Sequence, residues 1–473
     1  MMKSATRREF LTAGVVGATV TGLGIPILSE EAMAYQYQPP ASLPYSPARE
    51  EVNAILAKPF EGRIVKVRDG VYSAMGYALG NMIMIETNDG LVIVDTTESI
   101  KVAEKIMAEF RKISDKPIKY IIYTHSHGDH YRGTKAFYKP EMKVVAHELF
   151  MPELKLQNIR GLRGRMGAVA MFALQFPPNE RHASVGIYPE PRWTRLNWEM
   201  IAPKDLIFPN VTFNEKHVFK LGGLSFECIH TPGETPDQII VHIPEYKLVI
   251  CGDNFYASFP NLYTIRGTSY RPVAEWAEAQ DTVINLAPEI LVPMHGFPIK
   301  DAAEIKNVLG NYRDAINHVH NLAYSAVKKN MTIDQFLPQA KLPPELSKQP
   351  YLQEYYGNVK YCAQAIYESL VGWFDGDPVN LNPLTRKELG AEILALAGSA
   401  DNILAQADKA QKAGRHQAVL ELCEMVLQNT PENETARRMK IVSLQALSNL
   451  SINGPTINWY KSFALFETDM MEE

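Results

Sequence analysis

The residues best suited to chemistry lie together in one short run, Thr124-His125-Ser126-His127-Gly128-Asp129-His130. The run directly follows an apolar stretch, residues 118–123, which reads as a buried strand. Three imidazoles and a carboxylate at a strand-to-loop turn can converge on two metal ions, and both are ligand types that zinc prefers. Only 12 histidines occur in the whole chain, so this clustering indicates a metal site rather than an exposed polar loop.

A framework of strands must hold these residues, and the apolar pattern predicts one. Strands are expected at 64–67, 71–73, 82–86 and 91–94, followed by a helix at 99–112. A second strand-rich stretch, from about 211 to 251, repeats this order of parts. Two such halves, each a sheet with helices outside, would stack as a four-layer sandwich. Residues 150–205 between them look irregular, which predicts a loop over an active-site mouth.

Beyond about residue 301 the strands disappear and helical patterns dominate. Helices are expected at 302–321, 351–370, 386–397, 400–414, 416–428 and 432–447, the last four resembling a helical-hairpin array. We therefore predict an α+β protein with a catalytic domain at 63–305 and an all-α domain at 306–450. An extended N-terminal arm at 35–62, which begins with the Pro- and Tyr-rich residues 35–48, and a C-terminal tail at 451–473 complete the expected organisation.

The N-terminus predicts export. Arg7-Arg8 with Phe10-Leu11, an apolar Gly/Ala-rich stretch and Ala32-Met33-Ala34 are typical of a twin-arginine signal peptide, here residues 1–34. The stretch is short and rich in glycine, so it is a poor membrane helix, and no other part of the chain predicts a membrane span. We therefore expect a periplasmic protein.

Length and composition limit the classes of protein that remain. The 473 residues indicate two or three packed units, and 46% hydrophobic with 21% charged residues is usual for a folded, soluble protein. A formal charge of -5, spread evenly, argues against nucleic-acid binding and leaves a small molecule as the expected partner. Four cysteines without CxxC spacing predict buried free thiols.

The His-x-His-x-Asp-His run resembles the signature of the metallo-β-lactamase fold family, and the two predicted sheet-and-helix halves agree with that αββα sandwich. The resemblance implies further ligands in a fixed order: Glu234 in a Thr-Pro-Gly turn, then Asp253 and His295, each after a strand. It assigns one Zn²⁺ to His125, His127 and Glu234, the other to Asp129, His130 and His295, and makes Asp253 the bridge. Asp237 lies near enough to Glu234 to compete as the ligand.

Other polar residues have less specific roles. Asp95, after the strand at 91–94, either orients a ligand histidine or caps a turn. The remaining histidines singled out by the sequence, His147, His182, His230 and His242, are expected to be structural.

Several segments resemble the alkylsulfatase branch of this family. They are the acid at 234, Gly80-Asn81-Met82, the segment Asn261-Leu262-Tyr263-Thr264-Ile265-Arg266-Gly267, and Gly372-Trp373-Phe374-Asp375-Gly376-Asp377-Pro378. The resemblance implies that Arg266, with Asn261 and Tyr263, holds a sulfate group, and the planar donors of an arginine suit that anion. It also implies a homodimer formed through the helical domain.

The chain departs from that branch in three places. Asp253 stands where alkylsulfatases carry a bridging glutamate, and the turn before Glu234 is one residue shorter. The chain ends at Glu473, which leaves no room for the sterol-carrier-like domain that alkylsulfatases use for long aliphatic substrates. Detergent-like chains are therefore not the expected substrate.

The sequence thus predicts a periplasmic hydrolase of alkyl sulfate esters with two zinc ions per chain. A metal-activated hydroxide would be the nucleophile, with Asp129 and Arg266 as the catalytic residues and a small anionic ester as the substrate. One alternative keeps the metal site but changes the ester class to a lactam, lactone, thioester or phosphoester. A lesser alternative is a non-catalytic, zinc-bearing dimeric scaffold.

Overall fold

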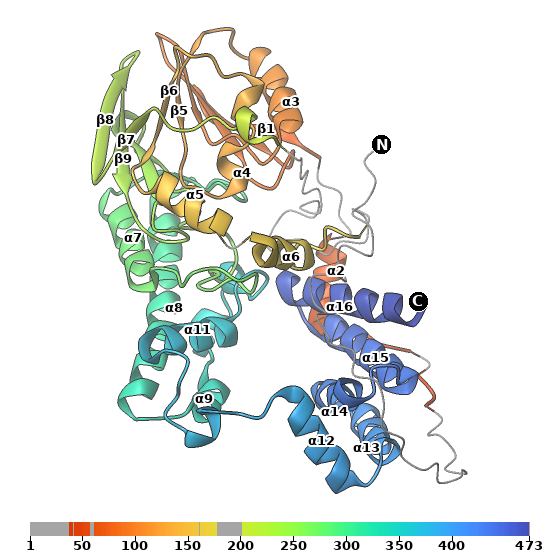
Figure 1. Ribbon diagram of the computed structural model, residues 1–473. Coiled ribbons are helices and arrows are strands. Elements are labelled where there is room, and N and C mark those ends of the chain that lie inside the picture. The colour runs from red at the N-terminus through yellow and green to blue at the C-terminus, as the bar shows by residue number, and fades with distance from the viewer. Residues whose placement is uncertain (1–36, 41, 57–60, 160, 177–200, 473) are drawn as a thin grey trace. The chain divides into compact units, whose positions relative to one another are not determined.

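Two β-sheets lie face to face in the first half of the protein (Figure 1). The computed structural model describes residues 37–40, 42–56, 61–159, 161–176 and 201–472. The first sheet has the strand order β1 (Arg63–Arg68), β2 (Val71–Met75), β3 (Met82–Glu86), β4 (Leu91–Val94), β5 (Ile118–Ile122), β6 (Lys143–His147), β7 (Val211–Phe213). The second has the order β12 (Ile290–Val292), β11 (Leu248–Ile250), β10 (Ile239–Ile243), β9 (Leu224–His230), β8 (Lys216–Leu221).

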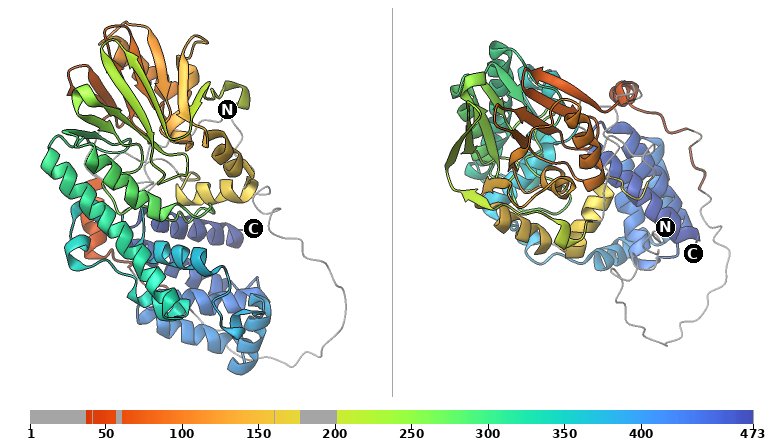
Figure 2. Two further views of the ribbon diagram at one scale, coloured as in Figure 1. Left: turned by 90° about the vertical axis from the view of Figure 1, so that its left-hand side faces the viewer. Right: turned by 90° about the horizontal axis from the view of Figure 1, so that it is seen from above.

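Three apolar layers bind the sandwich together. Val92, Ile122, Val241 and Val292 belong to the layer between the two sheets. The outer face of the first sheet packs on α3 (Ile100–Arg111). The outer face of the second sheet packs on α7 (Val273–Asn285) and α8 (Ala302–Lys328), which run together below the strands (Figure 2). The predicted four-layer α+β sandwich is confirmed.

Helices make up the rest of the described chain. They include α9 (Ile333–Phe336), α10 (Pro344–Ser347), α11 (Val359–Val371), α12 (Arg386–Ala397), α13 (Ala400–Lys412), α14 (His416–Asn429), α15 (Glu434–Leu450) and α16 (Gly454–Glu472). Asp301, Asn358, Thr385, Ser399 and Asn433 accept a backbone N–H at the starts of α8, α11, α12, α13 and α15. Among the described residues, none of the helices is long and apolar enough to cross a bilayer.

Three local expectations were wrong. Residues 150–171, expected to be irregular, form α5 (Phe150–Ile159) and α6 (Gly161–Met171). The predicted tail at 451–473 is largely α16, and the predicted arm contains α2 (Pro47–Leu56). Helices α5 and α6 have little amphipathic pattern, and α6 packs on α16, so contacts between distant segments stabilise helices that the local pattern did not indicate.

Some predictions concern parts of the chain that the structure does not describe. The signal peptide at 1–34 and the part of the active-site loop at 177–200, with His182, lie outside the described residues. The predicted boundary at 305/306 falls within α8, which continues unbroken through it.

Candidate active site

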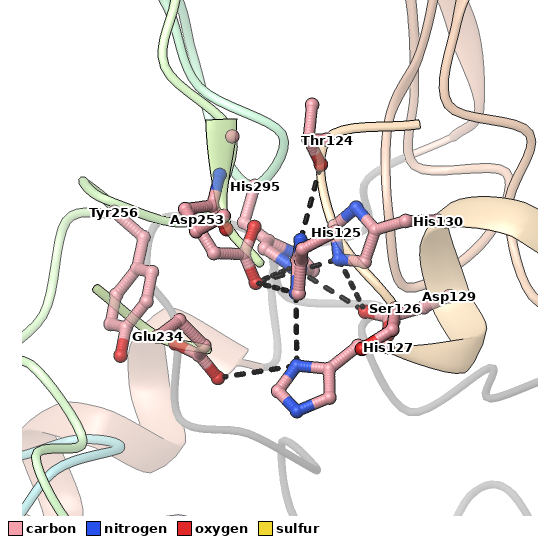
Figure 3. A network of polar contacts seen from close by, with 12 residues as sticks. Thr124, His125, Ser126, His127, Asp129, His130, Glu234, Asp253, Tyr256 and His295 are labelled. Atoms are coloured by element: carbon pink, nitrogen blue, oxygen red, sulfur yellow. Dashed lines mark hydrogen bonds and ion pairs between the residues drawn. The ribbon is translucent and has the colours of Figure 1, made fainter. Parts of the chain in front are cut away.

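The site forms where strands of both sheets end. Thr124–His130 follows β5 and Asp95 follows β4, whereas Asp253 follows β11, His295 follows β12 and Glu234 lies between β9 and β10. Because β4 runs parallel to β5, and β11 to β12, their carboxyl ends meet at one edge. All seven predicted metal ligands gather at this edge (Figure 3).

The potential ligands form two groups, each with its ligand atoms within 4.8 Å of one another. One group is His125, His127 and Asp253, and the other is Asp129, His130 and His295.

Asp253 lies between the groups. Its Oδ2 is 3.8 Å from His125 Nε2, 3.4 Å from His130 Nε2 and 3.1 Å from His295 Nε2. Asp129 Oδ2 lies 3.4 Å from both His130 Nε2 and His295 Nε2. One carboxylate oxygen thus faces both groups, as a bridging ligand must.

The cluster fits divalent cations. Within the described part of the chain, three of its buried atoms have no hydrogen-bond partner: His130 Nε2, Asp253 Oδ1 and Glu234 Oε2. An unpaired buried polar atom costs about 1–3 kcal/mol, so three together call for a further partner. Imidazole nitrogens and carboxylate oxygens are donors that metal ions of the zinc type bind.

The two groups differ in charge. Burial disfavours the protonated form of His130 and His295, but neighbouring carboxylates, Asp253 foremost at His295, outweigh it. The pKa of His130 is therefore raised well above its usual value, and that of His295 to about 9. Burial lowers the pKa of His125 and of His127 well below the usual value. A cation that binds at His130 and His295 must displace protons, whereas the imidazoles of His125 and His127 are already neutral.

Asp95 orients His130. Its Oδ2 lies 2.6 Å from His130 Nδ1, while its two oxygens also accept the backbone N–H and the hydroxyl of Thr124, each at 2.7 Å. The Nδ1–H of His130 is thereby fixed as a donor, and Nε2 is left for a metal ion. The backbone φ of Asp95 is 54°, a left-handed conformation that aspartate tolerates better than most residues. This is the orienting contact predicted for Asp95.

A second set of contacts orients His295. Its Nδ1 lies 3.0 Å from the carbonyl oxygen of Leu79. The Asn81 amide donates to the carbonyls of Pro293 and Gly296, at 3.2 and 3.0 Å, and so fixes the loop that carries His295. The sequence indicates Asn81 only through the family resemblance, because a contact between the residue before β3 and the loop after β12 has no local signature.

Glu234 lies beside the first group, held by a cation that sequence reasoning missed. Its Oε1 is 3.7 Å from His127 Nδ1 and 3.0 Å from Arg271 Nη2. Burial raises the pKa of Glu234, although Arg271 opposes the shift. Asp237 instead accepts the hydroxyl of Ser126 at 3.1 Å, and burial raises its pKa to about 7. Between the two acids, Glu234 is therefore the one that faces His127.

Arg271 is almost fully buried, and its Nη1 donates to the carbonyl of Asn261 at 2.7 Å. One signal could have found it. It is a second arginine shortly after the predicted anion-binding segment 261–267, and it directly precedes Pro272 at the start of α7.

Arg266 contacts the ligand cluster directly. Its Nη2 lies 3.3 Å from His127 Nε2, and its Nη1 donates to Thr264 Oγ1 at 3.1 Å. The buried side chain of Asn261 interacts with the phenol of Tyr356, and its amide nitrogen makes no other hydrogen bond among the residues described. The ring of Tyr263 packs near that of Tyr270, with centroids 5.9 Å apart, and its contact with substrate stays a prediction.

The histidines expected to be structural lie away from these groups. His147 and His230 stack on each other, with ring centroids 3.7 Å apart, and His242 Nδ1 lies 2.9 Å from Glu227 Oε2. The predicted free thiols are confirmed: Cys228, Cys251, Cys362 and Cys423 are all buried and unbridged.

The four-layer sandwich and the ligand cluster at its edge together define a metallo-β-lactamase-fold hydrolase. The Metallo-beta-lactamase superfamily model matches residues 76–150 and 165–295, and the Alkyl sulfatase dimerisation model matches residues 332–468. The solved structure of the stereoselective inverting sec-alkylsulfatase Pisa1 from Pseudomonas sp. has the same fold. It matches with a TM-score of 0.77 at 22% identity, over 93% of this chain and 73% of that chain.

Sequence relatives narrow the class to one family. A linear primary-alkylsulfatase of Pseudomonas sp. (strain ATCC 19151) is 34% identical over 392 residues, covering 81% of this chain and 73% of that protein. An (R)-specific secondary-alkylsulfatase of Pseudomonas sp. is 27% identical over 424 residues, and the match spans 62% of its length. The chain belongs to the alkylsulfatase family of metal-dependent, metallo-β-lactamase-fold hydrolases, as its motifs predicted.

Proposed function

We propose that this protein hydrolyses alkyl sulfate esters at a pair of zinc ions, with Arg266 holding the sulfate group. The observation that carries the proposal is the 3.3 Å approach of Arg266 Nη2 to His127 Nε2. A guanidinium beside a metal-ligand cluster offers planar donors to the oxygens of a tetrahedral anion. The relatives named as alkylsulfatases support the same ester class.

The proposed ligand sets follow the two groups. His125, His127 and Glu234 would hold one zinc ion, Asp129, His130 and His295 the other, and Asp253 would bridge them. Two zinc ions held here would lower the pKa of water enough to supply hydroxide near neutral pH and would offset negative charge on the ester.

The protein's own side chains bind and orient. Arg266 and Arg271 bring two positive charges to the neighbourhood of His127, and Glu234 neutralises the charge of the buried Arg271. Because the guanidinium of Arg266 has its second donor side on Thr264, its plane is fixed before the ester arrives. Asp95 keeps the proton of His130 on Nδ1, away from the metal ligands.

Replacing Arg266 tests this function. Arg266→Ala should lower kcat/KM for hexyl sulfate at least ~100-fold, since a charge-assisted pair to the reacting anion is lost, while both zinc ions remain bound. Zinc is measured by elemental analysis, and Arg386→Ala, which removes an exposed arginine of α12, is the control. Normal turnover by Arg266→Ala would overturn the role.

The alternatives have their own outcomes in the same assay. Wild-type protein that turns over a lactam, lactone, thioester or phosphoester but no sulfate ester has a different substrate class. Zinc-loaded protein that hydrolyses none of these compounds is the scaffold.

We further propose that the protein acts in the periplasm after twin-arginine export. The support is the Arg7-Arg8 motif with its apolar stretch and Ala-x-Ala site. Fractionation of cells that produce the full chain tests this, because Arg7→Lys with Arg8→Lys should leave the protein in the cytoplasm. Equal export of the double variant would contradict it.

Two copies are proposed to pair through the helical domain. The dimerisation family match covers the region between α11 and the end of α12, where Trp373 is 75% exposed, Val379 76% and Leu396 88%. Exposed apolar side chains that gather in one stretch of the chain are typical of a protein–protein interaction site. Light scattering should give twice the chain mass for wild type and the monomer mass for Trp373→Asp with Val379→Asp. A monomeric wild type would refute the pairing.

A further inference from the structure

Helix α16 reaches the segment that carries Arg266, although the helical domain separates the two in the sequence. Asn453, 3% exposed, stands at the start of this helix. Its side-chain N–H groups donate to three carbonyls of the turn 354–357, at 3.0, 2.9 and 3.2 Å. Its side-chain oxygen accepts the N–H of Thr456 at 3.0 Å, which caps the first turn of α16.

The turn 354–357 also fixes the start of the anion-binding segment 261–267. Gly357 donates its N–H to the carbonyl of Phe259 at 3.1 Å. A Cβ at Gly357 would lie 2.2 Å from the carbonyl oxygen of Pro260, so only glycine permits this approach. Asn261 follows directly and its side chain interacts with Tyr356 of the turn, so the position of its amide depends on the turn.

A second line of contacts runs from α16 through α6, which lies beside it (Figure 1). The buried side chain of Asn458 donates to the carbonyl of Met171 at 2.9 Å. Met171 Sδ accepts the hydroxyl of Thr264 at 3.3 Å, and that same hydroxyl accepts Arg266 Nη1 at 3.1 Å. A Cβ at Gly167 would lie 2.4 Å from the Arg266 carbonyl oxygen, so α6 also backs the main chain there.

We propose that α16, through Asn453 and Asn458, positions residues 261–266 for the anionic group of the substrate. The inference rests on the proposed role of Arg266 as the sulfate ligand. Asn453 acts on the start of the segment and Asn458 on its end, so both are positioning residues that act without touching substrate. Since a displacement of about 1 Å can cost as much as ~100-fold, a loosened segment should bind sulfate about tenfold more weakly.

Two variants separate positioning from folding. Asn453→Asp keeps the oxygen that caps α16, because aspartate caps as well as asparagine, but removes the donors to the turn. Asn458→Leu removes the donor to Met171 at similar volume and introduces no charge. The matched control is Asn433→Asp at the start of α15, where the side chain accepts the N–H of Ala436 at 2.9 Å.

The experiment uses the zinc-loaded full chain. Calorimetry with inorganic sulfate gives Kd, hexyl sulfate gives KM and kcat, and zinc content and Tm are measured alongside. In both test variants, Kd and KM should rise about tenfold while kcat changes by less than about twofold and zinc content is unchanged, because ground-state anion binding is what is lost. Asn433→Asp should match wild type.

Arg266→Lys, measured in parallel, separates the failure of this inference from failure of the proposed function. If that variant loses sulfate affinity while the Asn453 and Asn458 variants bind like wild type, the positioning role of α16 is wrong. If Arg266→Lys also binds like wild type, the proposed sulfate site itself is wrong. Loss of zinc together with sulfate in the asparagine variants would show general damage and would also overturn the positioning role.

Discussion

Asp95→Asn is the sharpest test of how the site orients its ligands. Asparagine tolerates the left-handed backbone of this position, where φ is 54°, and its oxygen can still accept the N–H of Thr124. Its amide group, however, stands where His130 Nδ1–H and the Thr124 hydroxyl both need an acceptor. His130 then loses the partner that fixes its tautomer and ring orientation.

The expected size of the effect follows from that single lost contact. Removing a partner that orients a metal-bound histidine typically weakens metal binding about 10–100-fold, or about 1.4–2.8 kcal/mol. Competition with a chromophoric chelator near neutral pH measures the dissociation constant for each binding step of the proposed zinc pair. One step should weaken by this factor and the other should change less, because among the described residues His125 is linked to Asp95 only through the hydroxyl of Thr124 and His127 does not hydrogen-bond to Asp95. Excess zinc should restore hydrolysis.

The control for this test is Asp115→Asn, which removes an exposed aspartate from the loop before β5. It should leave both zinc constants unchanged. The reasoning is refuted if Asp95→Asn binds both zinc ions with wild-type constants, since the 2.6 Å contact to His130 would then have no part in holding the ligand.

Three further predictions concern stability. Burial lowers the pKa of His147 in the folded protein to about 4. As the pH falls, the unfolded chain therefore binds a proton at His147 before the folded protein does. The free energy of unfolding that comes from this difference is complete above about pH 6.5 and is lost as the pH falls to about 4. In His147→Asn, the free energy of unfolding from denaturation curves should fall by up to about 3 kcal/mol less than in wild type across this pH window. An equal fall in both proteins would contradict the prediction. Glu467→Gln leaves Arg437 buried without a counter-charge and should cost about 3–5 kcal/mol by urea unfolding, whereas a change below about 1 kcal/mol would show that the pair matters little. Gly133→Ala would place a Cβ 2.0 Å from the Thr96 carbonyl oxygen and should lower Tm by several degrees; an unchanged Tm would mean that the loop yields freely.

Sequence patterns predicted the parts of the fold that depend on local order. Residues 91–94 are buried on both faces, so their unbroken apolar run identified β4, and the histidine run after β5 identified the site because its ligands are neighbours in the chain. The distant ligands Glu234, Asp253 and His295 could be placed only by family resemblance, since nothing local pairs them with the histidines.

What the sequence did not predict depends on contacts between distant segments. Arg271 is significant only because folding brings Glu234 to 3.0 Å from it. Helix α6, rich in glycine, has little amphipathic pattern and is held by Asn458 of α16. Helix propensity and hydrophobic periodicity predict neither kind of contact, because both depend only on residues that are neighbours along the chain.

The four buried thiols determine how this fold responds to redox conditions. Burial raises the pKa of Cys228, Cys251, Cys362 and Cys423, so almost none of the reactive thiolate forms near neutral pH. Because the protein forms no disulfide bonds, it can fold in a reducing compartment and stay chemically unchanged in an oxidising one. A chain of this kind needs no disulfide isomerase in either environment.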